Sequence, residues 1–133
     1  MKSAAIEFDG NSLTIRNVNY YAHDYYSDLT FDVEVKSEGF SGIAPFEYNM
    51  RMFKKFISNL EKMYDFKKPL VEFNDIEYGN KFSLEMSKTG RIKISGDIFD
   101  CGREHELKFS FYADQTMLKV FTEELKQLVD EYE

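Results

Sequence analysis

The chain has 133 residues, of which 43% are hydrophobic and 17% aromatic. This is enough for a substantial core, and we expect a single domain spanning residues 1–133. The 24 acidic residues exceed the 17 basic ones and give a net charge of −7. Such a charge opposes nucleic-acid binding and speeds encounter with a basic partner, although it also simply keeps a small protein soluble.

The sequence contains no apolar run long enough to span a membrane and does not begin with the apolar block of a secretory signal. Cys101 is the single cysteine, so the chain cannot form an internal disulfide bond. A lone cysteine is typical of a reducing compartment. We therefore expect a cytoplasmic protein.

The N-terminal part reads as strands. Asp9-Gly10-Asn11 separates two short alternating runs and predicts a tight hairpin turn, because Gly and Asn tolerate a positive φ. The segment 29–36, LTFDVEVK, alternates strictly between apolar and polar residues and predicts a half-buried strand. The sequence GFSG at 39–42 is expected to end that strand.

A helix is predicted to begin at Pro45, because proline is well tolerated at the first helical position and Glu47 suits the first turn. Apolar residues recur at spacings of three and four and form one stripe, consisting of Phe46, Met50, Phe53, Ile57, Leu60 and Tyr64. Pro69 disfavours helical geometry at the preceding residue and ends the helix.

Four more strands are predicted around LVEF, KFSLEMS, RIKISGDIF and ELKFSFYA, with hairpin turns at KTGR and DCGRE. The alternation then changes to a helical period at Asp114. Aspartate is a strong N-cap, so we interpret Asp114 as the start of a helix rather than as a catalytic residue. The apolar stripe of this second helix contains Leu118, Phe121, Leu125, Leu128 and Tyr132.

The resulting order is β-β-β-α-β-β-β-β-α. It predicts an α+β fold, with a mostly antiparallel sheet of about six or seven strands and two amphipathic helices on one face. The opposite face of the sheet is then wet and charged. Its expected residues are Asp32, Glu34, Lys36, Ser83, Glu85, Ser87, Arg91, Lys93, Ser95, Lys108, Ser110 and Tyr112. The sequence shows no internal repeat.

Motifs for chemistry are few, and we predict no catalytic, cofactor-binding or metal-binding residues. The nearest approach to a nucleophile pair is Cys101 with His105, in a predicted loop that would hold the two poorly. His23 and His105 are well separated and lack zinc-site spacing. The glycines at 39 and 42 match no phosphate-binding loop.

The segment 19–29, NYYAHDYYSDL, is the best candidate for a binding surface. Tyrosine is enriched at interface hot spots, and nearby aspartates favour a basic partner. The candidate partner-binding residues are Tyr20, Tyr21, Asp24, Tyr25, Tyr26 and Asp28. The alternative is that these tyrosines seal an edge of the core.

The order of motifs from Leu29 to Leu128 resembles the WapI-type family of bacterial immunity proteins. The resemblance rests mainly on GFSG at 39–42, and on Asp114-Gln115-Thr116 followed by Leu118 and Phe121. These elements are a turn and a helix cap, so they support the fold more than the function. The resemblance implies a protein that binds and neutralises a cognate toxin, often a nuclease. It identifies no binding residues, because such surfaces diverge with each toxin.

Three hypotheses follow for the function. An inhibitory module that binds a basic toxin explains the acidic charge, the tyrosine segment and the polar sheet face. A small-molecule binder or enzyme with an unrecognised pocket is the alternative. A third possibility is a subunit that pairs with other chains through a sheet edge.

Overall fold

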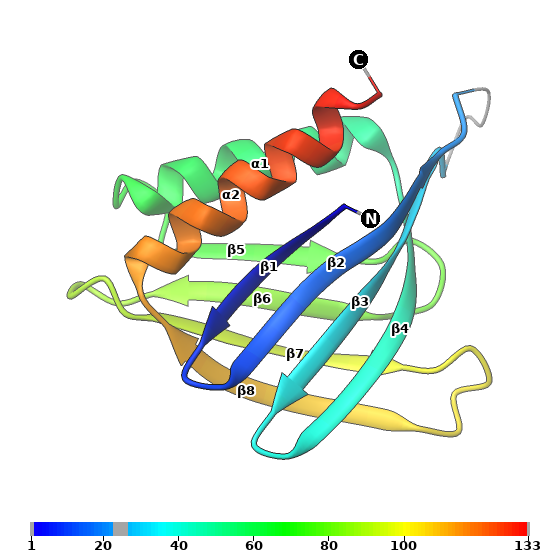
Figure 1. The fold of residues 1–133 in the computed structure, drawn as a ribbon, viewed down its shortest axis with the longest axis horizontal. Coiled ribbons are helices and arrows are strands. Elements are labelled where there is room, and N and C mark those ends of the chain that lie inside the picture. Colours follow the sequence, from blue (N-terminus) through cyan, green and yellow to red (C-terminus); the bar gives the residue numbers. More distant parts are fainter. Residues whose placement is uncertain (1, 23–26, 133) are drawn as a thin grey trace.

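The computed structural model describes residues 2–22 and 27–132. Four strands and a helix follow one another, and the same order then repeats (Figure 1). The elements are β1 (Ser3–Phe8), β2 (Asn11–Tyr20), β3 (Leu29–Ser37), β4 (Phe40–Tyr48), α1 (Met50–Tyr64), β5 (Leu70–Asn74), β6 (Lys81–Met86), β7 (Ile92–Phe99), β8 (Glu106–Ala113) and α2 (Gln115–Asp130). The repeat is structural, since the sequence shows no matching period.

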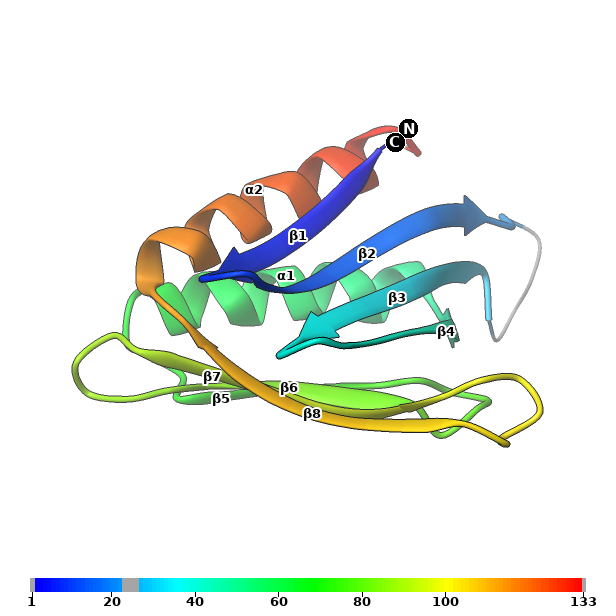
Figure 2. The ribbon, with the colours of Figure 1, turned by 60° about the horizontal axis from the view of Figure 1, so that its bottom comes forward.

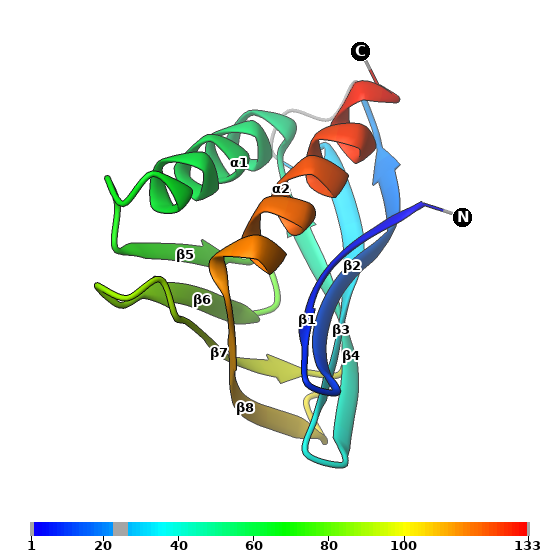
Figure 3. The same ribbon diagram turned by 60° about the vertical axis from the view of Figure 1, so that its left-hand side comes forward.

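Each group of four strands forms its own antiparallel sheet, in the order β1-β2-β3-β4 and β5-β6-β7-β8. The two sheets face each other (Figure 2). They approach closely where β4 contacts β7 and diverge toward the helices, which fill the open side (Figure 3). Helix α2 packs against β1, whereas α1 packs against β5 and α2.

The α+β class and both helices are confirmed, but the prediction of one sheet of six or seven strands is wrong. The residues expected on one wet face are consequently divided between two outer faces. Asp32, Glu34 and Lys36 lie on the sheet of β1–β4, whereas Lys93 and its neighbours lie on the other sheet. The four strands predicted after the first helix are present as β5–β8.

Strand β4 was missed because its sequence imitates a helix start. Within GFSG only Gly39 lies in the turn, and the chain re-enters the sheet at Phe40. Proline lacks the N–H that a central strand needs, but Pro45 lies on β4, a terminal strand, where that donor is dispensable. Helix α1 begins five residues after Pro45, with Asn49 as its N-cap.

Both helix starts are fixed by side chains that accept backbone hydrogen bonds. Asn49 accepts one from the Met52 N–H at 2.8 Å. Asp114 accepts one from the Met117 N–H at 3.0 Å, which confirms the predicted cap. Of the predicted apolar stripes, Phe46 lies on β4 and Tyr132 beyond the end of α2, so neither belongs to a helix. The other stripe residues are helical and buried, except that Tyr64 is half-buried.

The centre of the core is a cluster of aromatic rings contributed by both sheets and α1. The rings of Phe73 and Phe82 stack at 4.9 Å between centroids, and those of Tyr48 and Phe73 at 4.3 Å. Phe31, Phe46, Phe53 and Phe56 complete the cluster. Burial raises the pKa of Tyr48 to about 12. The high aromatic content is thus largely explained by packing.

Two sheet edges are covered by other parts of the chain. The N–H of Ala5 on β1 donates a 3.0 Å hydrogen bond to a carboxylate oxygen of Glu124 on α2. On β4, the N–H and carbonyl of Glu47 bond to Asp75 and Ile76 of the loop after β5. Covering an edge in this way prevents it from pairing with another chain.

Candidate functional site

The loop between β7 and β8 contains Cys101 and His105, the pair considered for nucleophilic chemistry. Cys101 is exposed. The N–H of His105 donates a 3.1 Å hydrogen bond to the Asp100 carboxylate, and this bond is the main cause that lowers the pKa of Asp100. The contact closes the loop. Among residues 2–22 and 27–132, no three potential ligands come together as a metal site.

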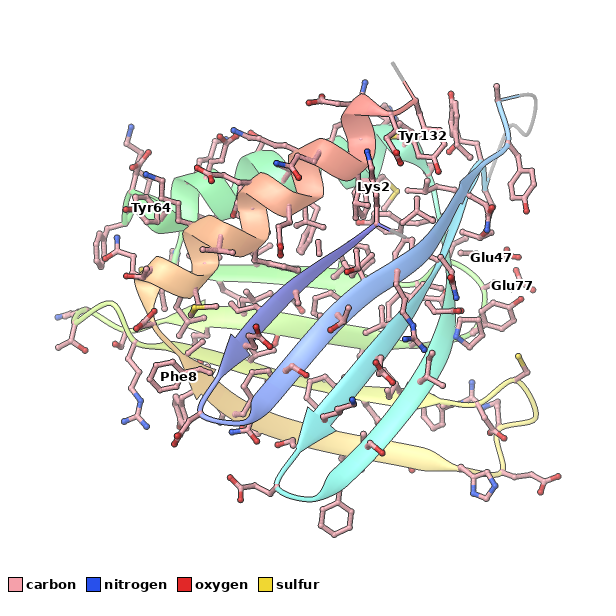
Figure 4. The ribbon with its side chains drawn as sticks, viewed as in Figure 1. Lys2, Phe8, Glu47, Tyr64, Glu77 and Tyr132 are labelled. Carbon is pink, nitrogen blue, oxygen red and sulfur yellow. The ribbon has the colours of Figure 1, made fainter. Side chains whose placement is uncertain are left out.

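The structure describes three of the six candidate partner-binding residues. Tyr20 is half-buried and lies 5.7 Å from the ring of Tyr132, whose hydroxyl donates to the carbonyl of Val18 (Figure 4). Asp28 accepts a 2.8 Å hydrogen bond from the N–H of Met50 and so supports the start of α1. Tyr21 is 53% exposed. Tyr20 and Asp28 therefore have structural roles, and Tyr21 remains available to a partner.

The other three candidates, Asp24, Tyr25 and Tyr26, lie outside the described residues, as does His23. The prediction that they contact a partner therefore stays a prediction.

An open cavity of about 640 Å³ lies on the outer face of the β1–β4 sheet, where the β2–β3 register shifts. We call it the bulge cavity; its polar lining residues are Asn17, Asn19, Thr30, Asp32, Glu47 and Tyr78. Asn17 has a φ of 56°, which creates the bulge, and its side chain donates a 2.8 Å hydrogen bond to Asp32. Among the residues that the structure describes, two carboxylates and no lysine or arginine line this cavity.

A buried carboxylate holds one wall of the bulge cavity in place. Asp75 is only 9% exposed and accepts hydrogen bonds from the N–H groups of Glu47, Glu77, Tyr78 and Asn80, at 2.6–3.2 Å. Glu47 and Glu77 are labelled in Figure 4; both carboxylates act on the hydroxyl of Tyr78. Burial, followed by the charge of Glu47, raises the pKa of Tyr78.

Asn80 ties the same loop to both sheets. Its amide donates a 2.8 Å hydrogen bond to the carbonyl of Pro45 on β4, and its oxygen accepts a 2.6 Å bond from the N–H of Phe99 on β7. Asp75 and Asn80 were missed by the sequence analysis. The segment NDIEYGN has the spacing at which an aspartate accepts from N–H groups two and three residues on, and this signal could have identified the loop.

The charge around the cavity is mainly negative. On the outer face of the β1–β4 sheet, Glu34 is paired with Arg16 at 3.5 Å, whereas Asp32 bonds the neutral Asn17 amide. Arg16 lies opposite Asp32 in the β2–β3 register, but its ion pair is with Glu34. The two carboxylates of the cavity lining are Asp32 and Glu47. Such a surface favours a cationic group on a partner.

The fold and these surfaces define an acidic α+β domain with a polar cavity lined by carboxylates. A profile of the WapI-like immunity protein family matches residues 5–133. The chain therefore belongs to the WapI-like immunity protein family, and the resemblance inferred from its motifs is confirmed.

The architecture is also found in a chain from the crystal structures of Trypanosoma bruciei MRP1/MRP2. The TM-score is 0.54 at 12% sequence identity, with 98% of this chain and 83% of that chain covered. At this identity the similarity shows the fold alone. No curated protein matches the sequence significantly. No helix within the described ranges is long and apolar enough to cross a membrane.

Proposed function

We propose that this immunity protein binds and neutralises a cognate bacterial toxin with a basic surface, through non-covalent contacts made at the bulge cavity and Tyr21. The observation that carries the proposal is the pair of carboxylates, Asp32 and Glu47, in an open cavity whose described lining residues include no lysine or arginine. A lysine or arginine of the toxin would enter this cavity and pair with both. A nuclease is the first toxin class to test, because a protein that binds nucleic acid carries a basic surface.

The site is suited to hold such a partner without large rearrangement. The N–H and carbonyl of Glu47 are fixed by the loop of Asp75, and the Asp32 carboxylate is held by Asn17. Preorganised groups lose little entropy when a partner binds. Tyr21 would add an exposed aromatic contact at the end of the same strand that carries the bulge. Inhibition would follow from covering the toxin, with no bond made or broken.

The test is co-expression with the toxin domain encoded by the gene next upstream, with growth and the dissociation constant as readouts. Wild-type protein should restore growth and bind more weakly as salt increases, because exposed charge pairs are screened. Asp32→Lys should weaken binding by about tenfold or more, since it places like charges together. Glu85→Lys, on the outer face of the other sheet, is the matched control. Equal effects from the two reversals would remove the bulge cavity from the interface.

Tyr21 is tested separately with Tyr21→Ala against Tyr112→Ala, since both tyrosines are about half exposed. Only the former should weaken binding. The predictions for Tyr25 and Tyr26 are tested in the same way, by alanine substitution against a lone surface lysine.

We place this protein in the cytoplasm of the toxin-producing cell. The exposed, unpaired thiol of Cys101 supports that location, because such thiols persist best in a reducing compartment. Fractionation of cells that express the chain from its own promoter would test the location.

A further inference from the structure

A second open groove, of about 430 Å³, lies at the opposite end of β3 from the bulge cavity. We call it the β8 groove. One wall is the β3–β4 hairpin, with Glu38 and Phe40, and the other is β8 from Glu106 to Ser110. On β3 the bulge cavity is lined by residues 30–32 and the groove by Ser37, so the two surfaces are separated by roughly 17–23 Å at about 3.3 Å per residue.

The groove follows the edge of a strand. Five consecutive residues of β8 line it, although alternate side chains point to opposite faces of the sheet. Residues of both faces can line one groove only if the groove runs along the strand's edge. Strand β8 is the terminal strand of its sheet, so no strand pairs with its outer side within the described part of the chain. Alternate backbone N–H and carbonyl groups therefore face the groove.

The groove also has an apolar subsite. Phe40 is on the same face of β4 as Gly42, Ala44 and Phe46, because side chains alternate along a strand. Those three residues face the core, yet Phe40 is 70% exposed. The reason is that the β3–β4 turn projects past β8 (Figures 1 and 3), so no sheet covers the ring. Leu107 and Phe109 line the opposite wall.

The crossing of β4 over β8 closes one end of the apolar subsite. A Cβ atom at Gly42 would lie only 3.2 Å from a methyl group of Leu107. The missing side chain at Gly42 therefore lets β4 pass close to Leu107, and Phe40 lies two residues further toward the β3–β4 turn.

Charge decides what kind of segment fits. Glu38 and Glu106 stand on opposite walls, and Lys108 is the one basic residue among those that line the groove. A hydrogen bond with Asp97 raises the pKa of Glu106, so two carboxyl groups are crowded at this position. A basic side chain from a partner would relieve that crowding. A second copy of this chain would not, because each copy carries a net charge of −7.

We propose that the β8 groove takes an extended, basic segment of the toxin, which adds a strand to the edge of β8 and places an apolar side chain against Phe40 and Leu107. The backbone bonds supply affinity, and the apolar subsite fixes the register. This inference rests on the proposed immunity function and assigns the toxin a second contact, distant from the bulge cavity.

The test uses the upstream-encoded toxin domain with Phe40→Ala and Phe40→Asp, measured by calorimetry and by amide hydrogen exchange. We expect Phe40→Ala to weaken binding by about tenfold and Phe40→Asp by more, as for a hot-spot aromatic. Phe8→Ala is the matched control, because Phe8 is an exposed aromatic at the β1–β2 turn and does not line the groove (Figure 4). In the wild-type complex, amides of β8 should exchange more slowly, whereas amides of β5, the other terminal strand, should not change.

The outcomes separate the two proposals. If wild-type protein neither binds nor protects, the immunity function fails and this inference fails with it. If wild-type protein protects but Phe40→Asp and Phe8→Ala bind equally well, only the β8 groove is refuted. If β8 is protected in the isolated protein at high concentration and Phe40→Asp abolishes a dimer, the groove holds a second copy and the toxin assignment is overturned.

Discussion

Replacing Asp75 with alanine tests the view that one buried carboxylate builds a wall of the bulge cavity. The substitution removes the acceptor for four backbone N–H groups. Those of Glu77 and Tyr78 belong to residues that water can reach. The N–H of Asn80, which is 1% exposed, and that of Glu47 on the covered edge lose their partner without replacement. Two such groups at about 1–2 kcal/mol each give a loss of about 3 kcal/mol.

The assay is urea denaturation followed by circular dichroism, with a thermal melt in parallel. A loss of about 3 kcal/mol corresponds to a decrease of roughly 10 °C in Tm for a chain of this size. Asp32→Asn is the control, because its bond to Asn17 is exposed and should contribute less than about 1 kcal/mol. A loss below about 1 kcal/mol for Asp75→Ala would refute the reasoning, since it would mean that the loop holds its shape without the carboxylate.

Gly96→Ala should destabilise the protein by about 2 kcal/mol or more, because its Cβ would lie 2.5 Å from the carbonyl of Lys81 and 2.8 Å from the Phe109 ring. Gly102→Ala, where the nearest atom is a flexible Glu104 carbon at 3.9 Å, should stay within about 0.5 kcal/mol in the same denaturation assay, and similar values for both would contradict the packing. The Glu106 pKa is raised in the folded state, so its contribution to stability is present below the unfolded pKa and is lost as pH rises through the folded pKa. Asp97→Asn removes the carboxylate that causes this shift. In thermal melts, the stability of this variant relative to wild type should therefore increase from pH 4 to pH 7. A difference in Tm that does not change with pH would exclude the interaction between Glu106 and Asp97.

The sequence predicted correctly those features that depend only on neighbouring residues, such as the cap of α2, turns and strand alternation. Asp114 caps α2 as predicted, the hairpin turns at Gly10 and Gly90 have positive φ, and β8 alternates as expected. The helix start predicted at Pro45 was wrong, because the effect of a proline on a strand depends on where that strand lies in its sheet. A proline interrupts the hydrogen bonding of a central strand but is tolerated in an edge strand. That β4 is an edge strand follows only from the folded topology.

For the candidate site, the residue types could be predicted from the sequence, but the contacts between distant parts of the chain could not. Tyrosines and aspartates can be read from the sequence, but the hydrogen bond by which Asp28 supports the start of α1 joins residues 22 positions apart. The exposure of Phe40 was equally hidden. Alternation assigns it to the core face, and it is exposed because a hairpin from one sheet extends beyond the other.

Each helix packs on the sheet of the other half of the chain, and this arrangement has a consequence for folding. Helix α1 ends the first half but packs on β5 of the second, and α2 ends the second half but packs on β1 of the first. A chain cut between Phe66 and Pro69 would leave each fragment with an uncovered apolar sheet. We expect neither fragment to fold alone, and the mixed fragments to reassemble, so that this small immunity protein could be divided into a complementing pair.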